Sequence, residues 1–364
     1  MALTFTTTPN AQPASDARRA EILANPGFGQ SFTDHMLQAT WTPEQGWHDG
    51  RIDAYGPITL MPSAAVLHYA QEVFEGLKAY RHEDGSVWGF RPEANAARLQ
   101  RSCRRLALPE MSEEDFLGAL TALVEVDQAW VPVADGTEKS LYLRPFMYAS
   151  EAFLGVRPAR TVTFSIIASP AGAYFSGGLK PVTLWISEHY ARAGVGGTGS
   201  AKCGGNYASS LAGQLEGIEH GCDQAVFLDS ATQTFIEELG GMNLFFVTSD
   251  DRLVTPELTG TILEGVTRSS ILDLAKELGL DPQEKRIEIA EWKQGVASGE
   301  IREIFACGTA AVVTPVGELR WEGGSAASTA GESGGPVTNA IRTRLLDIQY
   351  GRAQDTHGWM RRLA

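Results

Sequence analysis

The sequence has few of the residues that stabilise secreted proteins or hold metal ions. Among its 364 residues there are four cysteines, at positions 103, 203, 222 and 307. No two of them have the C-x-x-C spacing that is typical of zinc sites and thiol exchange. We therefore expect free thiols, no metal centre and a cytoplasmic protein.

Long apolar runs and positive charge are also scarce. No stretch approaches the ~20 apolar residues of a membrane span. Residues 1–15 lack a basic start followed by an apolar run, so the pattern indicates no secretory signal. The 44 acidic and 30 basic residues give a net charge of -14. This charge argues against nucleic acids and anionic membranes as partners, but it says little about the substrate, because a local basic site can bind anions on an acidic protein.

What the sequence does contain is typical of a large globular enzyme of mixed α/β composition. Apolar residues make up 43% and charged residues 20% of the chain, and its length is enough for two domains. Helical periodicity over 95–108 and 112–127 precedes strand-like alternation over 139–148 and 162–168. We expect a domain over residues 1–170 with a flexible or extended arm over 1–26, a proline- and glycine-containing linker over 171–181, and a second domain over 182–364.

Lys202 lies between glycines and small residues, in Gly199-Ser-Ala-Lys202-Cys-Gly-Gly. A strand-like run, 182–187, precedes it, and helical periodicity follows at Tyr207, Leu211, Leu215 and Ile218. Small neighbours allow a flat ligand to approach the backbone. Burial or a nearby cation would lower the lysine pKa enough for a Schiff base. A solvated surface lysine remains the alternative from this stretch alone.

Two further stretches carry charged residues whose role the local pattern leaves open. Glu237 and Glu238 precede the apolar run 244–247. Because adjacent strand residues face opposite ways, at most one of them should point inward onto a cation, and both could be solvated. Tyr142 and Arg144 share one face of a strand. They form either an edge salt bridge or part of a pocket for a carboxylate.

Two segments can bind anions through backbone amides. The helix that begins near Thr267 offers free N–H groups and a hydroxyl, which suit a phosphate monoester, although Thr267 could simply cap the helix. The turn Gly308-Thr309-Ala310 offers a second set of amides and a hydroxyl. The run Gly194-Val-Gly-Gly-Thr-Gly199 matches G-x-G-x-x-G, but it does not follow a strand directly, and we interpret it as a chance match.

A lysine, an inward carboxylate, a helix N-terminus and an amide-rich turn are the groups that pyridoxal phosphate requires. At this point the chain resembles the fold-type IV pyridoxal-phosphate enzymes, and within them the branched-chain amino-acid aminotransferases. The matching motifs are dispersed over nearly the whole sequence: 32–37, 68–69, 74–76, 90–92, 141–145, 201–207, Glu238-x-Gly-x-x-Asn-Leu-Phe245, Thr255, Gly265-Val-Thr-Arg268, 308–310 and 348–351.

The resemblance implies a two-domain fold like that of D-amino-acid aminotransferases, with a small N-terminal α/β domain and a larger C-terminal pseudo-barrel domain. It also implies pyridoxal 5′-phosphate as cofactor. Lys202 would be the Schiff-base lysine and proton shuttle, Glu238 would hold the pyridine nitrogen, and Tyr207 would bond the phenolic oxygen. The residues implied for the phosphate are Arg98, Val266, Thr267 and Thr309.

The same resemblance implies a reversible ping-pong transfer of the amino group of leucine, isoleucine or valine to 2-oxoglutarate. The residues implied for the apolar substrate pocket are Phe28, Phe74, Tyr142 and Tyr174. Arg144 would accept the side-chain carboxylate of glutamate. Amides at Thr309 and Ala310 would take the substrate carboxylate, helped by Tyr69 from the partner subunit of a homodimer. Ala311 and Thr314 replace the C-x-x-C that some members carry, so we expect no thiol switch.

Several alternatives remain from the sequence. A D-amino-acid aminotransferase or an aminodeoxychorismate lyase would share the fold, but these are shorter and differ in the pocket segments. An amine transaminase or an aromatic-acid aminotransferase is harder to separate, because substrate range depends on loops. From another class, a nicotinamide dehydrogenase would have to use the glycines at 194–199. A non-catalytic binding protein would not need every reactive position filled.

Overall fold

The protein is described here by a computed structural model, which covers residues 2–133, 135–172, 180–328, 331 and 334–364. Backbone contacts divide the chain into two compact units. Unit 1 comprises 1–176, 201–204 and 347–364, and unit 2 comprises 177–200 and 205–346. The sequence pattern predicts that all of 182–364 belongs to the second domain, whereas the structure groups two short pieces of that range, 201–204 and 347–364, with unit 1. Most of the expected linker lies outside the described residues.

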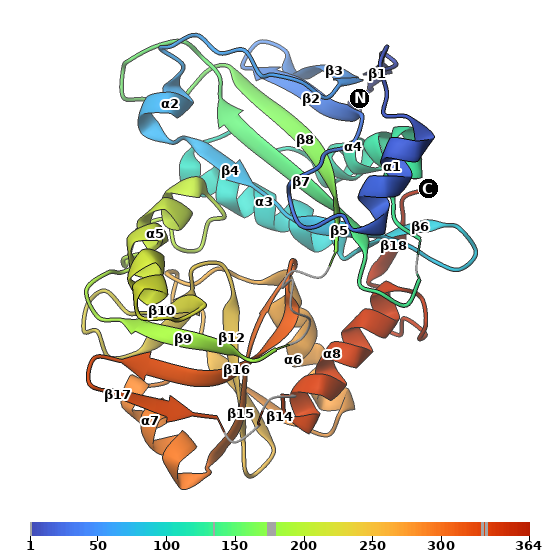
Figure 1. Ribbon diagram of the computed structural model, residues 1–364. Coiled ribbons are helices and arrows are strands. Elements are labelled where there is room, and N and C mark those ends of the chain that lie inside the picture. The colour runs from blue at the N-terminus through green and yellow to red at the C-terminus, as the bar shows by residue number, and fades with distance from the viewer. Residues whose placement is uncertain (1, 134, 173–179, 329–330, 332–333) are drawn as a thin grey trace. The chain divides into compact units, whose positions relative to one another are not determined.

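Unit 1 is built on a nine-stranded sheet that is almost entirely antiparallel (Figure 1). Its strand order is β1 (Thr6–Thr7), β3 (Gly46–Ala54), β2 (His35–Thr42), β8 (Val162–Ala171), β7 (Ser140–Ala149), β5 (Leu77–Arg81), β6 (Val87–Phe90) and β18 (Met360–Arg362), and β4 (Glu72–Phe74) also pairs with β7. The unit's α-helices are α1 (Asp16–Ala24), α2 (Ala65–Tyr69), α3 (Pro92–Leu106) and α4 (Glu113–Val126).

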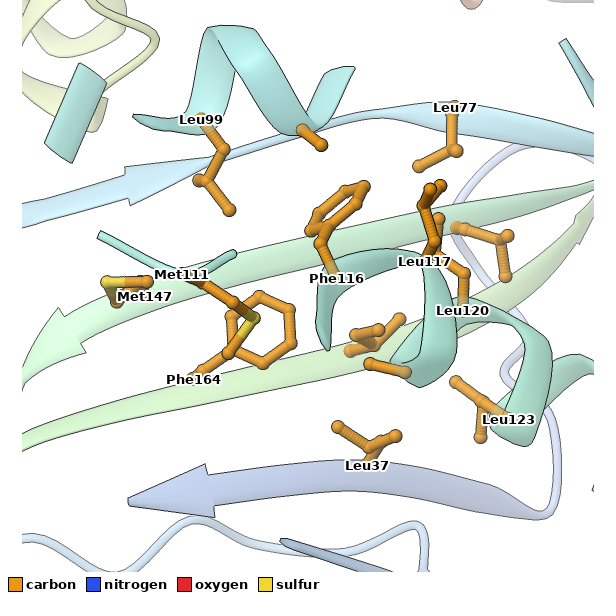
Figure 2. Close-up of a cluster of buried hydrophobic side chains, with 14 of the residues drawn as sticks. Leu37, Leu77, Leu99, Met111, Phe116, Leu117, Leu120, Leu123, Met147 and Phe164 are labelled. Carbon is orange, nitrogen blue, oxygen red and sulfur yellow. The ribbon is translucent and has the colours of Figure 1, made fainter. Parts of the chain in front are cut away.

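The core of unit 1 lies between this sheet and the apolar faces of α3 and α4. Figure 2 shows Leu117, Leu120 and Leu123 of α4 in one apolar cluster with Leu37 on β2, Leu77 on β5 and Phe164 on β8. The expected helices and strands of this half are therefore confirmed, because each has enough apolar residues at its own period to be buried. Ala201 and Cys203 also belong to this core, which explains why residues 201–204 group with unit 1.

The expectation of a flexible or extended arm over 1–26 is wrong for part of that segment. Helix α1 begins after Ser15, whose hydroxyl accepts a hydrogen bond from the N–H of Arg18. No residue of α1 is buried, so the apolar periodicity that identifies core helices is missing here. The N-cap and surface ion pairs such as Arg18–Glu21 stabilise the helix instead.

Unit 2 contains a second nine-stranded sheet of mixed direction, which curls so that β11 also contacts β12 and β13. Its order is β11 (Ile236–Leu239), β10 (Gln224–Leu228), β9 (Val182–Ser187), β16 (Val312–Trp321), β15 (Ile301–Gly308), β12 (Asn243–Thr248), β13 (Arg252–Pro256) and β14 (Asp281–Lys285), with β17 (Gly324–Ala327) on β16. The helices are α6 (Val266–Glu277), α7 (Ile289–Ser298), most of α5 (Gly204–Glu219) and most of α8 (Pro336–Gln349).

Helix α5 turns its small residues, not its large apolar ones, toward the sheet. Gly213 lies against Phe227 and Gly217 against Trp185, whereas Leu211, Leu215 and Ile218 are 65%, 57% and 57% exposed. The periodicity that predicted this helix therefore located it correctly but gave the wrong buried face. None of the described helices combines the length and the apolar composition needed to cross a bilayer.

Candidate active site

Lys202 is held in unit 1 by hydrogen bonds of its own backbone. Its N–H donates to the hydroxyl of Ser102 on α3 at 2.9 Å, and its carbonyl accepts from the N–H of Phe74 at 2.9 Å. The Lys202 ammonium lies 4.8 Å from the centroid of the Phe74 ring. The half-buried lysine is therefore not a surface side chain with an arbitrary direction, because the position of its Cα is set from both sides.

Arg98 lies one helical turn before Ser102 on α3 and is only 4% exposed. Its Nε and Nη2 donate to the two carboxylate oxygens of Glu75 at 2.8 and 2.7 Å. Asn95 donates to the same carboxylate at 2.7 Å. The positive charges of Arg98 and Lys202 and these hydrogen bonds lower the pKa of Glu75 against the effect of its burial. Arg98 is thus a buried, oriented cation and not part of a solvated basic face.

The aromatic residues expected to form the substrate pocket gather around Arg144 in unit 1. The Arg144 guanidinium lies 4.8 Å from the ring centroid of Phe74 and 5.3 Å from that of Tyr142. It also donates to the Tyr142 hydroxyl at 3.0 Å, and Phe28 meets Tyr142 edge-on at 5.1 Å. A Cβ at Gly76 would collide with the Tyr142 hydroxyl, so glycine is needed for the ring to lie there.

Arg144 differs from Arg98 in having no carboxylate bound to it. In the described part of the chain it forms no salt bridge, and its buried Nε has no hydrogen-bond acceptor. The interpretation as an edge salt bridge is therefore wrong. A guanidinium held by aromatic rings with an unsatisfied buried donor is suited to receive a carboxylate.

Two other expected substrate residues are placed differently. Tyr69, at the end of α2, is 40% exposed, and its hydroxyl donates to the carbonyl of Leu154. It is not brought against the Arg144 group by any contact in unit 1. Tyr174 lies outside the described residues.

In unit 2 the central residue is Glu238, which is 2% exposed. Its Oε1 forms an ion pair with Arg192 at 2.8 Å and accepts the N–H of Leu263 at 2.8 Å. Because Arg192 is itself buried, it supplies the positive charge that an ionised carboxylate requires away from water. Glu238 is therefore not solvated but points inward onto a buried cationic partner.

Asn243 connects Glu238 to the start of α6. Its side-chain N–H₂ lies 3.4 Å from Glu238 Oε2 and donates to the Leu263 carbonyl at 3.1 Å. A Cβ at Gly265 would collide with the Asn243 amide oxygen, so only glycine allows the approach. Gly265 is the N-cap of α6, and no side chain caps this helix. The amides of the first turn at Val266 and Thr267 are consequently available to an anion, and Thr267 is not the cap.

Tyr207 and the 308–310 turn complete the set in unit 2. The Tyr207 ring lies beside Gly241, and Gly241 in turn lies beside Gly308, the last residue of β15. Thr309 and Ala310 follow in the turn to β16 and are half-buried. Every cofactor residue predicted in unit 2 therefore belongs to one connected neighbourhood, namely Tyr207, Glu238, Val266, Thr267 and Thr309.

Some residues of this arrangement had no role in the sequence analysis. Arg192 had no signal at all, since a single arginine after a strand reads as a surface residue. Glu75 and Asn243 lay within the quoted motifs, but their partners become evident only in the fold. Ser102 could not be identified from the sequence, because its hydrogen-bond partner, the N–H of Lys202, is 100 positions away in the chain.

As expected, only one of the two adjacent glutamates points inward onto a cation, but the other one is buried as well. Glu237 is 5% exposed and lies on the other face of β11, where Thr261 donates to its Oε1. The sheet curls and both faces of this strand are covered, so alternation separates the two carboxylates without exposing either. Burial raises the pKa of Glu237 to about 7, despite the hydrogen bond from Thr261.

This shift predicts how Glu237 affects stability. Its ordinary pKa of 4.5 is raised to about 7 in the folded protein, so the folded state binds more protons than the unfolded state between these values. Stability then falls as pH rises through this window. Glu237→Gln should therefore raise the unfolding free energy by up to about 3 kcal/mol at pH 8 and change it little at pH 4. Urea unfolding at both values measures this difference.

The exposed Glu257 provides the matched control, and Glu257→Gln should leave both curves unchanged. Equal stability of the native protein and Glu237→Gln at pH 8 would mean that the carboxyl titrates normally in the folded state.

Comparison with known proteins bears on the chemistry of these residues. Residues 72–319 match the family Amino-transferase class IV. A branched-chain-amino-acid aminotransferase of Mycolicibacterium smegmatis is 55% identical over 99% of this chain and 98% of that protein. The branched-chain-amino-acid transaminase 1 of Bacillus subtilis is 47% identical, with 92% and 93% of the two chains covered.

Solved structures agree with this result. An Escherichia coli branched-chain amino acid aminotransferase superimposes with a TM-score of 0.76 at 28% identity, covering 91% of this chain and 99% of that one. A branched-chain aminotransferase from Thermoproteus uzoniensis, solved with norvaline, gives 0.73 at 26% identity, with 90% and 100% covered. The expected fold class is confirmed. The chain belongs to the class IV aminotransferases, in the family of the branched-chain-amino-acid aminotransferases.

Proposed function

We propose that this protein transfers the amino group of leucine, isoleucine or valine reversibly to 2-oxoglutarate, with pyridoxal 5′-phosphate as its cofactor. Two sets of residues, one in each unit, carry the proposal. Unit 1 holds a fixed lysine beside an aromatic group with an unpaired arginine N–H. Unit 2 holds a buried, ionised carboxylate next to an uncapped helix N-terminus. The four free, buried thiols also support a cytoplasmic location.

The residues present fit this cofactor. Gly265 keeps the approach to the α6 N-terminus open, and Glu238 is held ionised by Arg192. When bound, pyridoxal phosphate supplies an electron-withdrawing ring that accepts the electron pair left by loss of a substrate α proton. Lys202 would hold it covalently, Glu238 would keep its pyridine nitrogen protonated, and Tyr207 would bond its phenolic oxygen. The phosphate would be held by Arg98, Val266, Thr267 and Thr309.

Lys202 would also move the proton of the substrate α carbon. As a free amine it would be a base attached to a backbone that is fixed at both its N–H and its carbonyl. A base held in this way needs only side-chain rotation to reach the proton. The amides of Thr309 and Ala310 would orient the substrate by binding its carboxylate.

The substrate pocket has to accept both an aliphatic and an acidic side chain. Phe28, Phe74 and Tyr142 would provide the apolar contact for leucine, isoleucine or valine, together with Tyr174. The unpaired N–H of Arg144 would bind the side-chain carboxylate of glutamate. Because the guanidinium lies against aromatic rings, its apolar faces stay compatible with an aliphatic ligand.

An assay of the purified protein with a panel of amino acids and 2-oxoglutarate tests this function. Glutamate should form with leucine, isoleucine and valine. Lys202→Ala should lose at least about 10²–10⁴-fold of this activity, because it removes the acid–base group, and should lose the borohydride-reducible visible absorbance of the bound cofactor. Glutamate formation only with D-amino acids, or an intact reducible chromophore in Lys202→Ala, would refute the proposal.

The role of Glu238 predicts a different phenotype from that of Lys202. Glu238→Gln should retain the cofactor but lower turnover by about 10²-fold, because a neutral amide cannot stabilise a protonated pyridine nitrogen. The ratio of visible to ultraviolet absorbance reports cofactor content, and steady-state kinetics report turnover. Unchanged turnover with full cofactor content would mean that another group binds the ring nitrogen.

A homodimer is part of the proposal. Leu67 and Tyr69 on α2 lie near the segment of Leu154 and Val156, as the hydrogen bond from Tyr69 to Leu154 shows. The exposures of these four residues are 60%, 40%, 63% and 88%. Apolar side chains gathered in this way are typical of an interaction surface. We propose that a second copy covers them and that Tyr69 completes the partner's substrate site.

The double substitution Leu67→Asp/Val156→Asp should therefore convert the dimer into monomers, since two carboxylates would have to be buried without partners. Light scattering coupled to gel filtration measures the mass. Val133, which is 68% exposed elsewhere in unit 1, gives the matched control Val133→Asp, which should remain dimeric. A monomeric native protein would contradict the proposal directly.

A further inference from the structure

Unit 2 contains a cavity of about 280 Å³ on the face of β11 opposite Glu238, and Glu237 lines it. This volume lies just below the ~300–1,000 Å³ of ordinary ligand pockets, so the cavity has room for a molecule the size of a small amino acid. Its walls come from segments 229–237 and 256–262 and from Val195 and Arg286. None of the residues assigned to the cofactor or to the substrate contributes to it.

Glu237, which lines the cavity, has an acceptor oxygen without a donor. Within the described residues, Glu237 Oε2 has no hydrogen-bond partner, although the side chain is 95% buried. Its other oxygen, Oε1, accepts from Thr261, which also contacts Thr259 at 2.7 Å. The last torsion of a glutamate side chain is broad, so the carboxylate can turn an oxygen toward a donor in the cavity at little cost.

A second carboxylate makes this part of the cavity negative. Asp229 is 8% exposed and accepts the N–H groups of Thr232, Thr234 and Phe235 at 2.8–2.9 Å. These hydrogen bonds lower its pKa to about 2, against the effect of burial. Asp229 is therefore a permanent anion at neutral pH, and it attracts positive charge into the cavity.

One exposed residue of the cavity lining, Arg286, has the opposite charge. Arg286 is exposed, and its guanidinium carbon lies 3.5 Å from the ring centroid of Phe235. Contact with the ring fixes the planar group in place. In the described part of the chain it forms no salt bridge, so its N–H groups can bind a carboxylate from a ligand.

We propose that this cavity binds a small zwitterionic amino acid at a site separate from the one that performs transamination, with the ligand's ammonium on Glu237 and its carboxylate on Arg286. An anion is disfavoured by Asp229. A neutral apolar ligand would leave the Glu237 oxygen without a donor. No group of three metal-ligating side chains exists in the described part of the chain, so a divalent metal ion is disfavoured as well.

The inference goes beyond the proposed transamination and is tested without turnover. The probe is L-proline, because its secondary ammonium donates hydrogen bonds but cannot be transaminated as a primary amine is. Titration calorimetry on the cofactor-loaded protein should show one saturable site per chain. Glu237→Gln and Arg286→Gln should each weaken binding at least tenfold. Absence of saturable binding to the native protein would overturn the proposal.

Glu257→Gln is the matched control, since Glu257 also lines the cavity but is exposed at its mouth. Its affinity for proline should stay within about threefold of the native value. Loss of binding in this variant alone would place the ammonium at the mouth and refute the role of Glu237. Competitive inhibition of leucine turnover by proline, with unchanged binding in Glu237→Gln and Arg286→Gln, would place proline in the substrate site and also refute the proposal.

The pH dependence of proline binding gives a further readout that a purely structural role would not produce. The groups that act on Glu237 are Glu238 and Asp229, which raise its pKa, and Arg192, which lowers it; Glu257 and Arg286 also line the cavity. Since the pKa of Glu237 is about 7, a bound ammonium must displace a proton at lower pH. Affinity should fall roughly tenfold between pH 8 and pH 6, and an equal affinity at both values would contradict the assignment.

Discussion

The arrangement in unit 2 depends on one buried ion pair, that between Glu238 and Arg192. A carboxylate that is 2% exposed would normally take up a proton, because burial penalises its charge. Arg192 removes that penalty, and the Leu263 amide directs the same oxygen. Removing one partner of such a pair leaves an uncompensated charge and typically costs about 3–5 kcal/mol. Arg192, which had no role in the sequence prediction, thus compensates the charge of the carboxylate on which the proposed cofactor site depends.

In unit 1 the buried charge is positive, and an ion pair compensates it as well. Arg98 is a buried cation, and Glu75 compensates it through two hydrogen bonds. Glu75 also lies close enough to Lys202 for the lysine charge to influence its pKa. Among the described residues, no such carboxylate is bound to Arg144. The Arg98 guanidinium is therefore held by Glu75, whereas Arg144 keeps a buried N–H that can receive the carboxylate of a ligand. Arg98 is buried and paired, whereas Arg144 is only partly buried and lies against aromatic rings.

The sequence predicted the elements whose apolar period matches a buried face, such as α3, α4, β7 and β8. Its dispersed motifs pointed to the family, and the cofactor residues that they imply stay a prediction. The prediction failed where the buried face of a segment does not follow from the spacing of its apolar residues. Helix α1 buries nothing, and α5 packs through Gly213 and Gly217, so neither the presence of the first nor the buried face of the second could be read from apolar spacing. Arg192 and Ser102 could not be identified either, because their partners are distant in the chain.

The two glutamates of β11 show why residue type alone does not define a role. They are adjacent, equally acidic and both buried, yet Glu238 has a cation 2.8 Å away, whereas Glu237 has a hydroxyl and an unpaired oxygen. The strand's alternation places them in separate surroundings: Glu238 faces a buried cation, whereas burial raises the pKa of Glu237 to about 7. A curled sheet with both faces covered can therefore bury two adjacent carboxylates in different electrostatic surroundings, which a flat sheet with one solvated face could not do.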